Sequence, residues 1–254
     1  MSLITYANKM LLISPSWYDV FMKAYNQIVH IDSQLNIPYI EMDDTNKYYL
    51  SRDSATILPH PTQIFSIFEM IAINNIRVVI LGQDPYPNYY YSQFALKSMP
   101  NAHGLSFSVP RDAPIPSSLN NIFDELRNSI SNFVEPQHGN LTSWVQQGVF
   151  LLNTALTVYP KGESEHVKLW AGFTNFIIHE ISKANPHCIY ILLGKHAKTV
   201  ADKNVVSGHK LFASHPSGLS FARGDTPFRG SNIFAKCNAI LSKLGQPVID
   251  WNVY

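Results

Sequence analysis

The sequence predicts an α/β fold, a central parallel sheet of four strands with helices on both faces. Four short apolar runs alternate along the chain with segments whose apolar residues recur at helical spacing. The first run, 76–81, is continuous and rich in β-branched residues, which is typical of a strand covered on both faces. Strands that alternate with helices pair in parallel through right-handed crossovers, so helices are expected on both sides of the sheet.

Taken in order, the elements follow from these two periodicities. Pro61 opens a helical pattern that reaches residue 71, and the strand 76–81 follows it. Segments 32–60 and 88–101 are polar and rich in turn residues, so we expect loops there. The remaining expected helices are 116–130, 170–181, a short helix from Lys195, and 232–244, and the remaining expected strands are 149–152, 189–193 and 211–213.

Composition is that of a compact globular protein. The chain has 254 residues, of which 46% are hydrophobic and only 15% charged, so one domain over residues 1–254 can bury a sizeable core. Residues 1–58 form a less recognisable region expected to pack on it. No run is long enough for a membrane helix or a signal-peptide core, and we expect an intracellular protein of the nucleus or cytoplasm, in a host cell if it is viral.

The two cysteines are expected to be buried and reduced. Cys188 and Cys237 each sit within an apolar element and have no metal-ligand spacing, so two reduced, buried thiols are expected rather than a disulfide.

Charge is distributed unevenly along the chain. Residues 190–254 carry eight Lys or Arg against three Asp or Glu, whereas residues 1–60 carry four against six. A polyanion would therefore meet the C-terminal third. A chance excess of charge on a solvated face explains the same numbers.

Four unusual polar segments follow the four predicted strands. They read GQDPYP, NTALT, GKHAK and SHPSGLS. Ligands of such sheets bind outside the carboxyl ends of the strands, so one site is expected to collect a carboxylate, an amide and an imidazole beside two aromatic rings. These residues are Asp84, Asn153, His215, Tyr86 and Phe107.

This set of side chains suits recognition of a flat heterocycle. It lacks a nucleophile with its base, a metal-binding cluster and a Gly-rich phosphate loop. An asparagine amide matches the edge of a pyrimidine, and a carboxylate can stabilise the cation formed when a base leaves its sugar. Turn or capping roles for Asp84 and Asn153, a satisfied histidine at His215, and core positions for both rings remain alternatives.

Eight sequence blocks resemble, in order, those of a family 1 uracil-DNA glycosylase. The resemblance runs from about residue 59 to 251, with a weaker likeness at Ser16-Trp17. Eight blocks in order are more specific than any single tetrapeptide. The blocks are GQDPYP, HGLSFSVP, PSSLNNIFDEL, WVQQGVFLLNTALTV, EH…W…FT, ILLGKHAK, HPSGLS and PVIDW.

The resemblance implies a role for each pocket residue. Asp84 would activate water and stabilise the sugar cation, and His215, kept neutral, would donate to O2 of the departing uracil. Gln83 would offer backbone contacts to the base. Tyr86 would exclude a thymine methyl by its position against C5, while Phe107 would stack on the uracil and Asn153 would read its N3–H and O4.

The resemblance also implies binding to uracil-containing DNA, single- or double-stranded, with no cofactor and no metal. Leu219 would enter the base stack as the nucleotide swings out, although a packing role is its alternative. Loops around the site would grip phosphates, with cationic support from the C-terminal region. The residues implied in DNA binding are Pro116, Ser117, Gly194, Lys195, Ser217, Leu219 and Arg223.

Two departures from the family pattern stand out. Pro87 replaces the usual histidine, a variant that resembles members from large DNA viruses, and residues 88–98 form an insert. A competing hypothesis is a DNA-binding scaffold or polymerase accessory factor with weak or no activity, whose insert holds a replication or repair protein. A mismatch glycosylase that accepts thymine is disfavoured by Tyr86.

Overall fold

The centre of the protein is a four-stranded parallel sheet. The computed structural model describes residues 13–35, 40–42, 48–50, 57–160, 162, 165–218, 220–223 and 225–254. The strand order is β6-β3-β7-β8, and every neighbouring pair is parallel. The predicted fold class is confirmed. The strands are β3 (Val78–Gly82), β6 (Val149–Asn153), β7 (Ile189–Leu193) and β8 (His209–Ala213).

The burial of each strand follows from its sequence. All five residues of β3, β6 and β7 are buried, as continuous apolar runs require in a sheet covered on both faces. The edge strand β8 is partly exposed and begins with polar residues. The register pairs Gly82 of β3 with Asn153 of β6, and Leu193 of β7 with Ala213 of β8. The four carboxyl ends therefore lie at one edge of the sheet.

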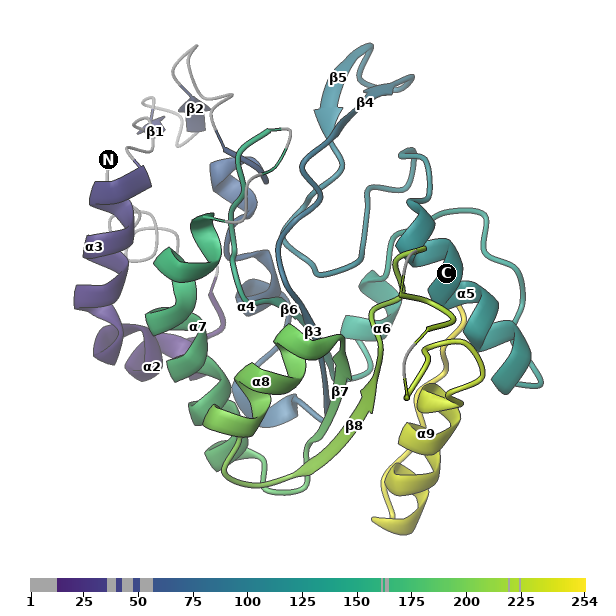
Figure 1. Ribbon diagram of the computed structural model, residues 1–254. Helices are drawn as coiled ribbons and strands as arrows, with labels where there is room; N and C mark the ends of the chain where they lie inside the picture. Colours follow the sequence, from purple (N-terminus) through teal and green to yellow (C-terminus); the bar gives the residue numbers. More distant parts are fainter. Residues whose placement is uncertain are drawn as a thin grey trace.

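Helices cover both faces of this sheet (Figure 1). One layer contains η1 (Pro15–Trp17), α2 (Tyr18–Lys23), α3 (Tyr25–Leu35), α4 (Ser66–Met70), α7 (Glu165–Ala184) and α8 (Lys195–Asn204). The other contains α5 (Ser117–Ser129), α6 (Thr142–Val145) and α9 (Ile233–Lys243). Short 3-10 turns η3 (Pro61–Gln63) and η4 (Ile73–Asn75) flank α4. None of the helices among the described residues combines the length and apolar character needed to cross a membrane.

An aromatic cluster fills the space under each helical layer. On the α7 side, the Phe68 ring lies 5.4 Å from Phe150 of β6 and 6.1 Å from Phe173 of α7. On the α9 side, the Trp251 ring lies 4.9 Å from Phe234 and 5.1 Å from Trp144. Most of these contacts are edge-to-face, the geometry that the aromatic quadrupole favours. The two clusters hold the sheet between them.

Two local predictions need correction. The helix expected over 61–71 is divided into η3 and α4, because Phe65 leaves helical geometry (φ −105°, ψ 15°) and packs its ring against α7 instead. The loop expected over 88–101 contains a hairpin, β4 (Tyr89–Ser92) paired antiparallel with β5 (Lys97–Pro100). Within 32–60, β1 (Ile40–Met42) pairs antiparallel with β2 (Tyr48–Leu50), and α3 extends to Leu35.

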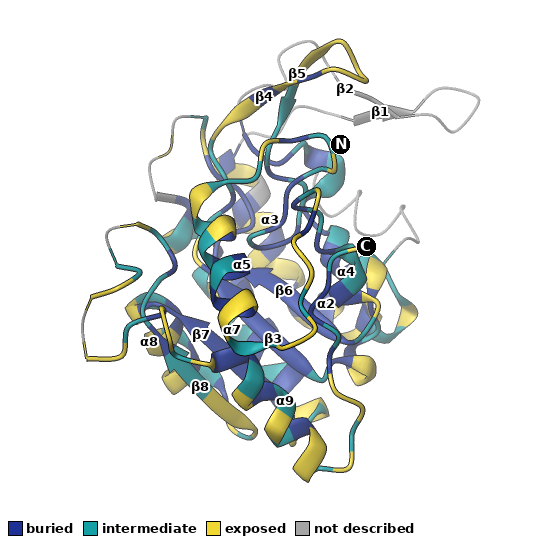
Figure 2. Ribbon diagram, turned by 90° about the vertical axis from the view of Figure 1, so that its right-hand side faces the viewer, coloured by how far each residue is buried: buried dark blue, intermediate teal, exposed yellow. Residues whose placement is uncertain are grey.

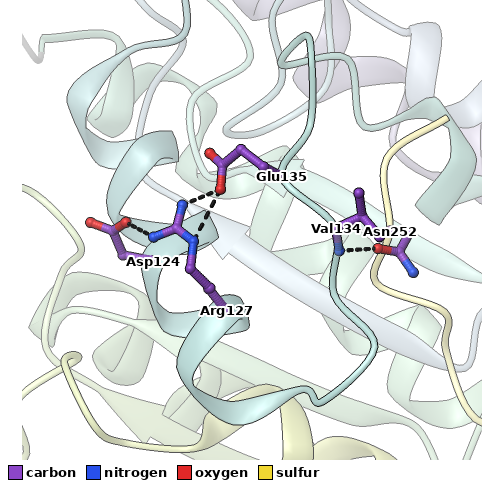
Figure 3. Close-up of polar contacts among 5 residues, drawn as sticks. All are labelled: Asp124, Arg127, Val134, Glu135 and Asn252. Atoms are coloured by element: carbon purple, nitrogen blue, oxygen red, sulfur yellow. Dashed lines mark hydrogen bonds and ion pairs between the residues drawn. The ribbon is translucent and has the colours of Figure 1, made fainter.

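The C-terminal segment packs across the α5 and α6 side. Asn252 accepts a hydrogen bond from the Val134 N–H at 2.8 Å and donates to the Asn132 carbonyl at 3.2 Å (Figure 3). The indole N–H of Trp144 donates to the Trp251 carbonyl at 3.0 Å. These contacts join residues more than a hundred positions apart, so the end of the chain is part of the folded core.

Both cysteines are free and buried, as predicted. Cys188 lies immediately before β7, and Cys237 lies within α9. Burial raises the pKa of the Cys237 thiol to about 12 and that of Cys188 further still. A thiol that stays protonated is a poor nucleophile, so these side chains act as small apolar residues.

Candidate active site

A cavity of about 130 Å³ opens at the carboxyl ends of β3 and β6. Four segments far apart in the sequence build its wall: the turn after β3, the loop before α5, the end of β6 and the turn after β8. Six residues predicted to act on the base all line this one cavity. They are Gln83, Asp84, Tyr86, Phe107, Asn153 and His215.

The position of Asn153 depends on a glycine in the neighbouring strand. Asn153 and Gly82 are register partners in β6 and β3, and a methyl group on Gly82 would lie 2.2 Å from the side-chain oxygen Oδ1 of Asn153. The Asn153 side chain therefore occupies space that only glycine leaves open. It is 9% exposed, so its amide is desolvated apart from the face it turns to the cavity.

A hydrogen-bond chain holds the turn that carries Asp84. The Gln83 carbonyl accepts from the Ala155 N–H at 2.8 Å and from the Thr154 hydroxyl at 2.9 Å. Because that hydroxyl uses its proton on Gln83, it accepts from His196 Nε2 at 2.8 Å. The side-chain amide of Gln83 also donates to Asp84 Oδ2, at 3.4 Å. The Asp84 carboxylate is thus positioned by contacts of Gln83, Thr154 and His196 as well as by its own turn.

Sequence reasoning missed this supporting pair. Thr154 and His196 lie in the NTALT and GKHAK segments, one residue after Asn153 and one after Lys195. The sequence did show that Thr154 and His196 lie beside predicted site residues at strand ends, and this position could have indicated a role at the site. What the sequence does not show is that β6 and α8 bring these two side chains within hydrogen-bond distance.

Two aromatic rings form walls of the cavity. The Tyr86 hydroxyl donates to the Phe107 carbonyl at 3.0 Å and lies 3.2 Å from Ser118 Oγ, so two contacts hold the hydroxyl end of the side chain. Burial raises the pKa of Tyr86 to about 12, which keeps the phenol neutral. Phe107 has φ +62°, an uncommon conformation for a bulky residue that its surroundings must impose. Neither ring is a fully buried core residue, the alternative that its sequence context left open.

His215 is arranged as a neutral donor. Its Nδ1 accepts from the Ser217 N–H at 3.0 Å, so the single proton of the neutral ring is on Nε2. Burial lowers the pKa of His215, against the opposing charge of Asp84. Its ring centroid lies 6.0 Å from that of Phe107. Gly194, at φ +100°, permits the close approach, since a methyl group there would lie 3.2 Å from His215 Cβ.

The predicted DNA-binding residues surround the cavity without lining it. Pro116 and Ser117 are at the start of α5, Gly194 and Lys195 at the start of α8, and Ser217 in the turn after β8. Ser117, Lys195 and Arg223 are exposed. The amide of Asn121 in α5 donates to the Pro216 carbonyl at 2.7 Å, which joins two of these segments. Leu219, the predicted wedge, lies outside the described residues.

Comparison with known proteins decides the family. The sequence model of the uracil DNA glycosylase superfamily matches residues 68–242, more than half of the chain. The chain belongs to this superfamily. In this superfamily member, the matched residues 68–242 include the six predicted residues that line the cavity and every predicted DNA-binding residue.

Individual relatives agree with this family assignment. Uracil-DNA glycosylase of Blochmanniella floridana is 37% identical over 225 residues, 88% of this chain and 96% of its own length. Uracil-DNA glycosylase of Francisella philomiragia is 42% identical over 202 residues, 78% and 86% of the two chains. The crystal structure of mimivirus uracil-DNA glycosylase has a TM-score of 0.81 and 28% identity, and covers 100% of this chain and 90% of its own. A variant of mimivirus UNG solved in complex with UGI has the same TM-score.

A larger hollow of about 710 Å³ lies at the opposite, amino end of the strands. Its wall includes Arg77, Gln147 and Cys188, and none of the predicted site residues of this superfamily member. The Arg77 guanidinium donates to the Gln147 carbonyl at 3.1 Å, and Cys188 is a buried, protonated thiol. Arg77 in this wall is therefore used in a structural contact.

Proposed function

We propose that this protein hydrolyses the N-glycosidic bond of uracil in DNA. It acts by flipping the nucleotide into the cavity, leaves an abasic site and so starts base excision repair. The observation that carries the proposal is that one cavity collects Asp84, Asn153 and His215 from three different strand ends. We assign the chain to family 1 of the superfamily because of the sequence blocks around these residues.

Uracil is selected by three walls of the cavity. The planar amide of Asn153 pairs with N3–H and O4 of the base, the Phe107 ring stacks on its face, and Tyr86 stands against C5. The contacts of the Tyr86 hydroxyl with Phe107 and Ser118 support this role, because they oppose movement of the ring away from a methyl group. Gln83 adds backbone contacts to the base.

Bond cleavage separates charge between Asp84 and His215. As the bond from N1 to C1′ breaks, the sugar becomes cationic and the pyrimidine anionic. The Asp84 carboxylate stabilises the cation and orients the water that attacks C1′. His215 donates a hydrogen bond from Nε2–H to O2 of the leaving base. The lowered pKa of His215 and the hydrogen bond from the Ser217 N–H to its Nδ1 support this role. Both favour a neutral imidazole with its proton on Nε2, which can donate this hydrogen bond and keep the proton.

DNA is bound by segments around the mouth of the cavity. The N–H groups at the start of α5, after Pro116, and the hydroxyls of Ser117 and Ser217 face the phosphates. The turn at Gly194 lies beside them, and Lys195 and Arg223 add charge. Leu219 fills the space left in the base stack. The exposure of Ser117, Lys195 and Arg223 supports this assignment, as does the bond that links α5 to Pro216.

The proposal is tested by incubating the protein with an oligonucleotide that contains one uracil and then cleaving abasic sites with alkali. We expect strand breaks with and without a chelator. Replacement Asp84→Asn should lower kcat by several orders of magnitude and leave DNA affinity nearly unchanged, because the carboxylate acts on the transition state. An equal loss of affinity and turnover would make Asp84 a structural residue.

The same assay separates the competing function. A scaffold or polymerase accessory factor that holds a replication or repair protein through residues 88–98 would bind DNA and produce no breaks. The exposed hairpin in this segment is the observation that favours a partner surface. A viral source remains a prediction from Pro87, since the similar proteins include both bacterial enzymes and the mimivirus one.

A further inference from the structure

The hairpin β4–β5 projects from the body of the protein (Figures 1 and 2). Pro87 and Ala102, which both line the cavity, lie two residues before β4 and two residues after β5. The Asn101 N–H donates to the Asn88 carbonyl at 3.0 Å and closes the base of the hairpin. Whatever the hairpin contacts is therefore held beside the base-binding site.

The hairpin is fixed to another segment at the site. The Tyr90 hydroxyl donates to Asp112 Oδ1 at 2.6 Å, and the Ser92 hydroxyl donates to Asp112 Oδ2. Burial, followed by the hydrogen bond to Asp112 and then by the Asp112 charge, raises the pKa of Tyr90 to about 12, so this donor stays protonated. Asp112 lies just before the Pro114–Ser118 loop that leads into α5. The hairpin and that loop thus move as one body.

The opposite face and the tip of the hairpin expose four large apolar side chains. Tyr91 is 59% exposed, Phe94 87% and Leu96 71%, and Tyr89 is at 39%. Tyr91 faces Ser98 across the hairpin, a residue too small to cover the ring. An exposed group of aromatic residues on a rigid support is typical of an interaction surface.

The charge of this surface indicates a polyanion. Residues 85–111 contain no Asp or Glu, whereas Lys97 and Arg111 are both exposed. Of the two carboxylates that flank this stretch along the chain, Asp84 lines the cavity, and Asp112 accepts hydrogen bonds from two hydroxyls of the hairpin. Aromatic faces on a stretch that carries cations and no carboxylate of its own match the way proteins hold unpaired nucleotides, by stacking on bases and attraction to phosphates.

We propose that the hairpin β4–β5 is a stacking platform for unpaired nucleotides that flank the uracil, with Tyr91 and Phe94 as the stacking rings. The proposal rests on the proposed function for the position of the DNA. The four residues of β4 reach about 13 Å from the cavity mouth. At about 3.4 Å per nucleotide, the tip meets the strand roughly four nucleotides from the flipped base.

A binding experiment tests the platform without any glycosylase activity. Affinity for a fluorescently labelled, uracil-free single strand is measured for the wild type and for the double variant Tyr91→Ala/Phe94→Ala. We expect the double variant to bind at least about fivefold more weakly, because stacking contributes strongly for each base. Val206→Ser, which changes a residue 61% exposed before β8, at the amino end of that strand, serves as a matched control and should bind like the wild type.

A turnover experiment places the platform relative to uracil. Substrates carry one uracil with about two or about ten unpaired nucleotides on each side, so that only the longer ones reach the tip. The double variant should raise KM on the long substrate and leave kcat and the short substrate unchanged. Tyr91→Phe/Phe94→Trp, which keeps the ring faces, should restore the wild-type KM.

The outcomes separate this inference from the proposed function. Equal binding of uracil-free DNA by the wild type and the double variant would overturn the platform and leave the hairpin as a surface for a protein partner. An equal rise in KM on short and long substrates would also overturn it, because the hairpin would then act at the cavity. Failure to release uracil from any substrate would contradict the glycosylase proposal alone, since the binding result does not depend on cleavage.

Discussion

At the scale of single residues, a glycine at the site determines where the Asn153 amide lies. Gly82 ends β3 and faces Asn153 in β6. The space that a side chain on residue 82 would fill is the space that the Asn153 amide occupies. The base recognition that we propose for Asn153 therefore depends on a position that has no functional group of its own.

Replacement Gly82→Ala should displace the Asn153 amide and lower kcat/KM for uracil release by about 100-fold, the scale expected for a displacement of about 1 Å at a site. Gly172→Ala is the matched control, because a methyl group at Gly172 in α7 meets no atom closer than 3.7 Å. Steady-state kinetics on one substrate measure both variants. Wild-type activity in Gly82→Ala would show that Asn153 does not need this position.

Tyr86 provides a second prediction at this scale. Replacement Tyr86→Ala should lower the preference for uracil over thymine by about 10- to 200-fold, the range for one methyl group in a pocket. Tyr86→Phe keeps the ring and loses the bonds to Phe107 and Ser118, so its preference should lie between those of the wild type and Tyr86→Ala. The two values of kcat/KM are compared on matched oligonucleotides. If Tyr86→Ala releases no thymine, another residue excludes the methyl group.

At the scale of elements, the C-terminal segment shows which contacts stabilise the fold. The Asn252 side chain is buried and bonds to the backbone of the loop after α5, whereas Arg127 pairs at the surface with Asp124 and Glu135 (Figure 3). The Arg127 side chain is 49% exposed. Water screens the surface pairs, but nothing replaces the buried bonds if they are lost.

Replacement Asn252→Ala should lower the free energy of unfolding by about 1–3 kcal/mol, since the Val134 N–H and the Asn132 carbonyl lose their partner. Arg127→Ala, the control on the same side of the molecule, should lower it by less than about 1 kcal/mol. Urea denaturation of both variants measures the difference. A larger loss for Arg127→Ala would mean that the surface ion pairs, not the buried amide, hold this segment.

At the scale of the whole molecule, one continuous apolar core joins the sheet and both helical layers. It extends from Trp17 near the N-terminus to Trp251 near the C-terminus, and both rings are 0% exposed. We therefore propose that the chain is a single domain that unfolds in one transition. Several histidines are partly or fully enclosed by this structure, and burial lowers the pKa values of His60, His103, His138, His196 and His215.

These histidines predict an acid-sensitive fold. Burial lowers the pKa of His103 from 6.5 to about 4, so between these values the unfolded chain binds more protons than the folded protein. The free energy of unfolding then increases with pH and is lost as pH falls from about 6.5 towards 4. His103→Gln should flatten this dependence, while His209→Gln, at an exposed position, should not. Thermal unfolding across this pH range measures it, and an unchanged slope in His103→Gln would assign the sensitivity to other groups.

The sequence by itself determined the order along the chain of the four sheet strands and the helices between them. It also determined the edge of the sheet at which the polar segments meet. A continuous apolar run such as 78–81 is stable only when covered on both faces, and the segment after each such strand must emerge at its carboxyl end. Asp84, Asn153 and His215 were predictable for this reason, and the family blocks gave each of them an expected role.

Tertiary structure alone decided how these residues are held. The hairpin β4–β5 depends on Asp112, twenty residues from Ser92, and the Asp84 turn depends on a hydroxyl and an imidazole that β6 and α8 supply. Phe107 keeps its uncommon φ among neighbours from other segments. Local propensity acts over a few residues, whereas these positions depend on strand register and on contacts between distant parts of the chain. For that reason the sequence predicted which side chains meet, and only the fold showed what keeps them in place.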